Sequence, residues 1–153
     1  MRAFSALLIF ALVSSTILGL QLMSLPTEAS TIAATIDIHP NTINLERKGR
    51  WVTAYIALPK PYNVSEINVS TVRLGVVPAE LHPIEIGDQD FDHVLDLMVK
   101  FDASSVIDYI WSKIYHMTPL KEHFIELTVS GELYDGTLFE GNDTIRIIHI
   151  EED

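Results

Sequence analysis

Four aspartates in the middle of the chain have a spacing that suits a metal ion. They are Asp88, Asp90, Asp92 and Asp96, at relative positions 1, 3, 5 and 9 of one short segment. Carboxylates at these positions, with a backbone carbonyl at position 7, are oxygen ligands of the kind that a looped chain offers to Ca²⁺. Without a cation, carboxylates this close repel one another. The spacing therefore predicts a calcium loop, and the alternative is a solvated acidic turn before a strand.

Two positions of this segment differ from the helical type of calcium loop. Position 6, where glycine normally allows a sharp turn, is His93, and position 12, normally a bidentate glutamate, is Val99. The residues that follow alternate between apolar and polar, as a strand does. The segment is therefore not an EF-hand, and His93 is the residue that weighs against a calcium site.

Motifs for catalysis are absent from the sequence. The chain has no cysteine, which excludes thiol catalysis, disulfide bonds and cysteine-ligated zinc or iron–sulfur centres. Its six histidines occur at none of the zinc-protease spacings, and no serine-hydrolase elbow, phosphate loop or dinucleotide-binding glycine pattern is found. We therefore expect a protein that is not an enzyme.

Charge and length narrow the class of protein further. The chain has 153 residues, of which 48% are apolar, enough for one domain with a real core. It has 21 acidic and 10 basic side chains, a net charge of −11. Nucleic acid is excluded as a partner because phosphate binding needs a basic face, and anionic membrane surfaces are disfavoured for the same reason.

The first 29 residues have the pattern of an export signal. Arg2 precedes a long uncharged apolar run that ends at Pro26, and small residues precede a candidate cleavage point after Ala29. The run approaches the roughly 20 residues that span a bilayer, so an uncleaved membrane-anchor helix is the alternative. We expect residues 1–29 to be a signal peptide or anchor, and the only contact with a membrane. Residues 30–153 then form one domain, located at the cell surface or outside the cell.

The exported part is dominated by alternation with a period of two, which is typical of half-buried strands. Strands are predicted at residues 31–38, 51–58, 71–77, 81–86, 93–101, 124–133 and 143–150. The pair Asp135-Gly136 indicates a hairpin turn, where a positive φ is needed. Seven short strands separated by turn signals predict an all-β fold, an immunoglobulin-like antiparallel β-sandwich.

One segment, at about residues 104–116, predicts an amphipathic helix inserted among the strands. Ser105 and Asp108 have the spacing of a capping box, and Pro119 follows the end of the segment. Its apolar residues fall at helical spacing and are Val106, Ile107, Ile110, Trp111 and Ile114. We expect this stripe to pack against the core, with a partner-binding face as the alternative.

Three asparagines lie in glycosylation sequons: Asn63, Asn68 and Asn142. In an exported protein, such sequons are candidate acceptors for glycans on surface loops. The sequence therefore predicts a glycoprotein if the cell has the machinery to use them.

Four segments together resemble a β-sandwich module of secreted and cell-surface proteins of archaea and bacteria. The matching segments are Ile36-Asp-Ile-His-Pro40 with Asn41-Thr-Ile-Asn44 and Arg47-Lys-Gly49, then Val64 to Gly75, Asp88 to Phe101, and Gly131 to Ile147. They occur in the order that the module has and cover nearly the whole exported part, although a Gly-Ser spacer is missing after Pro40. The resemblance implies a small, non-catalytic β-sandwich, often attached to larger exported proteins, with Asp88, Asp90, Asp92 and Asp96 as calcium ligands.

These observations predict an exported module with a structural or adhesive role. One alternative is a carbohydrate- or protein-binding module, in which Tyr62, Trp51 and Tyr55 would form an aromatic platform. Another is self-association into a surface fibre, in which the strand at residues 30–38 completes a neighbour's sheet.

Overall fold

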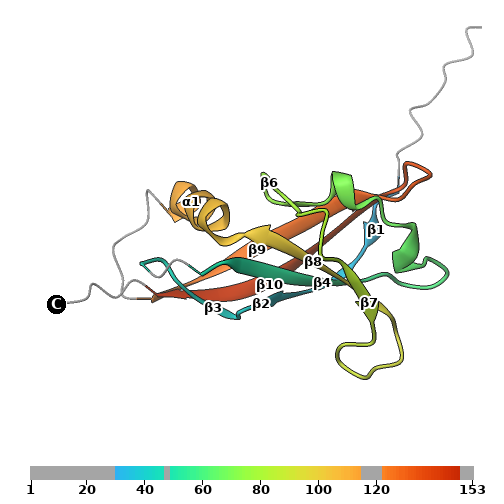
Figure 1. Cartoon of the computed structure of the whole chain (residues 1–153), viewed down its shortest axis with the longest axis horizontal. Helices are drawn as coiled ribbons and strands as arrows, with labels where there is room; N and C mark the ends of the chain where they lie inside the picture. Colours follow the sequence, from blue (N-terminus) through green and yellow to red (C-terminus); the bar gives the residue numbers. More distant parts are fainter. Residues whose placement is uncertain (1–29, 47–48, 115–121, 149–153) are drawn as a thin grey trace, which may run out of the picture.

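The computed structural model describes residues 30–46, 49–114 and 122–148, which form two packed sheets and one helix (Figure 1). The predicted signal or anchor at residues 1–29 lies outside the described residues, as do Arg47, Lys48 and residues 115–121 and 149–153. Within the described part, no helix combines the length and the hydropathy needed to cross a bilayer.

The larger sheet is built around a long hairpin. Its strands follow the order β1 (Ile32–Ala33), β10 (Leu138–Ile148), β9 (Glu122–Glu132), β5 (Arg73–Leu74) and β6 (Val77–Pro78), and β3 (Thr42–Asn44) also pairs with β10. The β9–β10 pair is antiparallel along the full length of both strands, whereas β1 and β3 run parallel to β10. Asp135 and Gly136 form the turn of the hairpin, and Gly136 has φ +86°, as the sequence predicts.

The second sheet contains four antiparallel strands. Their order is β2 (Thr35–His39), β4 (Trp51–Ala57), β8 (Asp96–Asp102) and β7 (Glu85–Gly87). The chain passes from β1 to β2 at Ala34, whose N–H donates to the carbonyl of Glu140. A Cβ on Gly141 would lie 2.2 Å from the carbonyl oxygen of Ala34, so the crossing requires glycine there.

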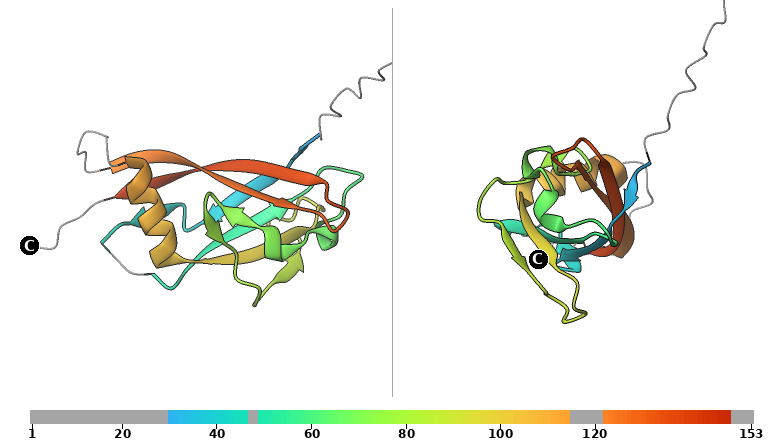
Figure 2. Two further views of the ribbon diagram at one scale, coloured as in Figure 1. Left: turned by 90° about the horizontal axis from the view of Figure 1, so that it is seen from above. Right: turned by 90° about the vertical axis from the view of Figure 1, so that its right-hand side faces the viewer.

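The core lies between the two sheets (Figure 2). The alternation predicted for β4 and β8 is confirmed, since the inward residues of both strands are buried and the residues between them are half-buried. These inward residues are Val52, Ala54, Ile56, Leu97, Val99 and Phe101. Leu95, which the same alternation would place on this face, precedes the strand and is 49% exposed. The described residues confirm a mainly β-sandwich fold with one helix.

The inserted helix, α1 (Ala103–Ile114), follows β8 directly. Its cap is Asp102, whose carboxylate accepts the N–H of Ser105 at 2.8 Å, so the prediction that Ser105 begins the helix is wrong. An N-terminal aspartate satisfies an N–H group that has no partner within the helix. The predicted stripe packs against the core except for Trp111, which is 39% exposed.

Five strand predictions need correction. The segment predicted as one strand at residues 31–38 is β1 and β2, which belong to different sheets, and the strand predicted from residue 143 begins earlier, at Leu138. The segment predicted as one strand at residues 71–77 is the end of a 3₁₀ turn, η2 (Val69–Thr71), followed by β5 and β6. These two strands form a hairpin because Gly75 turns the chain with φ +57°. The strands predicted from residues 81 and 93 begin later, at Glu85 and Asp96.

Candidate metal centre

The acidic segment forms the loop between β7 and β8. Gly87 and Asp96 pair across these two strands, so residues 88–95 close a hairpin at the end of the sheet. Viewed along the long axis, this hairpin projects from the body of the sandwich (Figure 2). Asp88 therefore follows β7 directly, and Asp96 is the first residue of β8.

Three of the four predicted ligands come together. Asp88, Asp90 and Asp96 each present a carboxylate oxygen, and these oxygens lie within 4.8 Å of one another. Two oxygens that coordinate one Ca²⁺ at about 2.3–2.6 Å lie at most about 5.2 Å apart, so this separation allows a shared cation. The structure thus brings together a group of three aspartates that could hold a metal ion.

The loop makes its sharp turn although histidine replaces glycine. His93 has φ +70° and Phe91 has φ +61°, both in the left-handed region. The N–H of His93 donates to Asp88 Oδ2 at 3.1 Å, and the N–H of Asp92 donates to Asp90 Oδ1 at 3.2 Å. The turn that a glycine usually makes is therefore present with His93 in that position.

One oxygen of the group is buried without a hydrogen-bond partner among the described residues. This atom is Oδ1 of Asp88. Leaving a buried polar atom unpaired costs about 1–3 kcal/mol, and more for a charged group. A cation coordinated by this oxygen would remove that cost, so the donor set fits a bound metal.

Asp96 is in an environment that disfavours its charged form. Burial raises the pKa of its carboxyl, and the negative charges of Asp90, Asp92 and Asp88 raise the pKa further. The N–H of Gln89, which donates to Asp96 Oδ2 at 2.8 Å, acts in the opposite direction. A cation would reverse the effect of the neighbouring charges.

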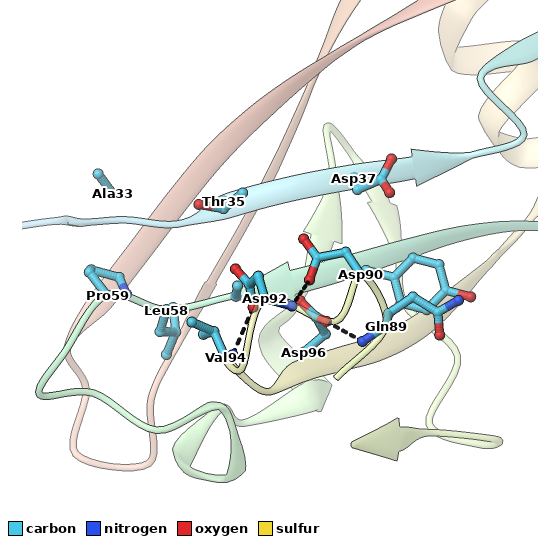
Figure 3. Close-up of a pocket in the computed structure, with 12 residues that line it drawn as sticks. Ala33, Thr35, Asp37, Leu58, Pro59, Gln89, Asp90, Asp92, Val94 and Asp96 are labelled. Carbon is cyan, nitrogen blue, oxygen red and sulfur yellow. Dashed lines mark hydrogen bonds between the residues drawn. The ribbon is translucent and has the colours of Figure 1, made fainter. Parts of the chain in front are cut away.

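Asp92 is not part of the group of three. Its Oδ1 accepts the N–H of Val94 at 2.7 Å, which ties the carboxylate to the backbone of the loop. Its side chain lines a groove of about 200 Å³ between the loop and strands β2 and β4, and Asp90 and Asp96 line the same groove (Figure 3). The spacing alone does not distinguish Asp92 from the other three aspartates, because its distinct role depends on the fold of the loop.

The three sequons occupy two kinds of site. Asn63 and Asn68 cap the 3₁₀ turns η1 (Val64–Glu66) and η2, and their side chains accept the N–H groups of Ser65 and Ser70 at 3.0 and 3.3 Å. Asn142 is exposed in the middle of β10. The predicted acceptor sites are thus two turn caps and one strand residue.

The aromatic residues named as a platform are spread along β4 and beyond its end. Trp51 and Tyr55 are both half-buried on β4. They lie about 13 Å apart along the strand, since a strand rises about 3.3 Å per residue. Tyr55 packs edge-on against His39, with ring centroids 5.6 Å apart, and Tyr62 lies beyond the end of β4 and is 38% exposed.

Comparisons with known proteins assign no family to this chain. A scan against protein-family models and a search of the curated proteins each find no match. Among solved structures, a cohesin module from a family 33 glycoside hydrolase of Clostridium perfringens ATCC13124 aligns with a TM-score of 0.28 and 10% identity, covering 79% of this chain and 100% of that chain. Similarity this low does not identify a family.

Proposed function

We propose that this chain is an exported, non-catalytic β-sandwich module of the cell surface or the extracellular medium, stabilised by Ca²⁺ bound in the loop at residues 88–96. The observation that carries the proposal is the convergence of Asp88, Asp90 and Asp96, together with the buried, unpartnered oxygen of Asp88. The export step rests on the signal-like pattern of residues 1–29.

Calcium suits this donor set better than the other common metals. The group of three offers carboxylate oxygens alone, whereas zinc prefers nitrogen and sulfur ligands. Mg²⁺ requires near-ideal octahedral geometry and usually keeps several waters, whereas Ca²⁺ accepts six to eight oxygen ligands in varied geometry. Extracellular calcium modules bind with dissociation constants of about 10⁻⁴–10⁻³ M, so a modest site suffices outside the cell.

The bound ion would stabilise the folded state. It would offset the repulsion among the carboxylates and connect the residue after β7 with the first residue of β8. Such a clamp would hold the end of the β7–β8 hairpin together, which suits a structural or adhesive module that meets calcium after export. We infer no catalysis, because the metal group lacks an accompanying nucleophile or base motif in the sequence.

The two alternative functions find less support. Two of the three rings named as an aromatic platform, Trp51 and Tyr55, are half-buried and about 13 Å apart along β4, so they do not form one exposed cluster. The strand predicted to complete a neighbour's sheet is used within its own chain, since β1 pairs with β10 and β2 pairs with β4. Strand exchange through residues 30–38 would require both pairings to open.

Thermal unfolding tests the calcium proposal. Binding to the native state raises the free energy of unfolding by RT ln(1 + [L]/Kd), about 2.7 kcal/mol at a hundredfold excess over Kd. We expect millimolar Ca²⁺ to raise the Tm relative to chelator, and Asp90→Ala to abolish the difference. Asp108→Ala, which removes an exposed carboxylate of α1, is the matched control and should keep it. Identical melts of the unsubstituted protein in Ca²⁺ and in chelator would contradict the proposal.

The export proposal has a separate test. Protein taken from the producing cells should begin near Ser30, or stay in the membrane fraction with its leader attached. A cytoplasmic protein that begins at Met1 would contradict both versions.

A further inference from the structure

The edge of the second sheet formed by β7 is open. β7 is the last strand in the order β2-β4-β8-β7 and, among the described strands, it pairs with β8 alone. Every residue from 81 to 87 is exposed. Figure 1 shows β7 at the border of the molecule, away from the helix and from the larger sheet. An open edge offers unpaired backbone N–H and C=O groups to another strand.

Exposed apolar side chains occur on β7 and on the segments that flank the β7–β8 hairpin in the sequence. Their exposed fractions are 54% for Leu81, 41% for Ile84, 45% for Ile86 and 49% for Leu95. Ile86 pairs with Leu97, whose side chain is 2% exposed, so both side chains lie on the inner face of the sheet. The side chain of Ile86 therefore extends the inner face of the sheet beyond Leu97, and the described residues leave it 45% exposed.

Two other edges of the sandwich are protected. On β2, the N–H of Ile38 donates to Asp143 Oδ2 at 2.8 Å, so a carboxylate from the other sheet occupies this edge. β6 contains Pro78, which has no N–H to donate. β7 has neither device, since it contains no proline and no N–H of its residues meets a side-chain acceptor in the described part of the chain.

We propose that β7 pairs with β7 of a second copy of this chain, antiparallel and about a two-fold axis at Ile86. In this register Ile86 faces Ile86 of the partner and each Glu85 faces a Gly87. No pair of like charges is then directly opposed, whereas opposed like charges would destabilise the pairing. A two-fold interface needs such a self-complementary patch, and the sequence of β7 supplies one.

This pairing joins the two four-stranded sheets into one continuous sheet and covers the apolar side chains at the edge. Each chain has a net charge of −11, so the copies repel each other at long range. Added salt screens this repulsion, and we expect association to strengthen from low to high ionic strength. The dimer does not require Ca²⁺, so a test in chelator separates this inference from the proposed calcium site.

Sedimentation equilibrium of the full chain in chelator and at high salt is the first test. The unsubstituted protein should reach twice its monomer mass as concentration rises, and Ile86→Lys should stay monomeric, because an edge lysine blocks strand pairing. Val76→Lys is the matched control and should still dimerise, since Val76 is 75% exposed but lies in the turn between β5 and β6. A monomer at every concentration, or a dimer that survives Ile86→Lys, would overturn the proposal.

The absence of cysteine allows a second test of the register. Directly opposed residues of antiparallel strands have Cα atoms about 4.5–5.5 Å apart, within the range of a disulfide bond. Under mild oxidation, Ile86→Cys should therefore form a covalent dimer much faster than Val76→Cys. Equal rates for the two variants would show that Ile86 does not lie on the two-fold axis.

Discussion

The β9–β10 turn and the β7–β8 loop both join neighbouring antiparallel strands and both contain aspartates, yet their carboxylates are in opposite situations. In the β9–β10 turn, Asp135 Oδ1 accepts the N–H of Thr137 at 2.8 Å, and this bond lowers the pKa of the Asp135 carboxyl. In the β7–β8 loop, burial and three neighbouring carboxylates raise the pKa of Asp96.

The difference shows when an acidic turn needs a cation. Asp135 is stabilised as a carboxylate by the backbone of its own turn, so the turn is complete without a ligand. In the β7–β8 loop, the carboxylate oxygens outnumber the backbone N–H groups that donate to them. Asp88 Oδ1 accepts no hydrogen bond from the described residues. The excess of oxygens over donors distinguishes a candidate metal centre from an ordinary acidic turn.

The largest expected effect of calcium is on hydrogen exchange in the β7–β8 loop, with no effect in the β9–β10 turn. At a hundredfold excess of Ca²⁺ over Kd, hydrogen exchange at the amides of Gln89 and His93 should slow by about 100-fold, provided that the loop opens with release of the ion. These amides donate to Asp96 and Asp88. The amide of Thr137, which donates to Asp135, should exchange at the same rate with and without calcium. Equal slowing at all three amides would remove the contrast between the two segments.

A second prediction concerns the left-handed residue of the β9–β10 turn. Gly136 has φ +86° and open space where a Cβ would lie. Gly136→Ala should therefore cost only the conformational penalty, about 1–2 kcal/mol of unfolding free energy. Gly87→Ala, also with open space but without a positive φ, is the matched control and should cost much less. Urea unfolding measures both variants, and equal losses would contradict the prediction.

A third prediction uses Asp102, an aspartate in the same situation as Asp135. The N–H of Ser105 lowers the pKa of its carboxyl, so its contribution to stability is present above the unfolded pKa of about 3.9 and is lost as pH falls through the lower folded value. Asp102→Ala should cost about 1 kcal/mol at pH 7 through loss of the helix cap, and less in acid. Asp102→Asn keeps an oxygen acceptor and should lose little. Urea unfolding at neutral and acidic pH tests this; a pH-independent cost for Asp102→Ala would argue against it.

The smallest expected effect is that of His93→Gly. Glycine relieves the left-handed conformation of His93 but increases the conformational entropy of the unfolded chain by a similar amount, so the unfolding free energy should change by less than about 1 kcal/mol. The His93 side chain is 95% exposed, so calcium binding should survive the substitution. Loss of calcium binding in His93→Gly would show that the imidazole, and not the turn, matters in this loop.

Local patterns predict much of this fold. The alternation of Val52, Ala54 and Ile56 predicts the buried face of β4, and Asp135-Gly136 predicts the turn of the long hairpin. The same patterns do not predict β3, because a strand of three residues has too little pattern and pairs with a distant part of the chain. The turn at Gly75 interrupts the strand predicted at residues 71–77, and glycine between two short apolar segments is the signal for that turn.

The sequence predicts which residues form the candidate site, but not how their side chains are arranged. The spacing of four aspartates identifies the loop, yet the separate role of Asp92 and the unpartnered oxygen of Asp88 depend on how the backbone turns at Phe91 and His93. The open edge at β7 was not foreseen either, since which strand ends a sheet is decided by pairings across the whole chain.

Calorimetric titration with Ca²⁺ tests the central claim most directly, because it counts bound ions without relying on stability. We expect one bound ion per chain for the unsubstituted protein and for Asp135→Ala, and no binding for Asp90→Ala. An unsubstituted protein that takes up no Ca²⁺ at millimolar concentration, or an Asp90→Ala variant that binds it equally well, would contradict the assignment of the β7–β8 loop as a calcium site.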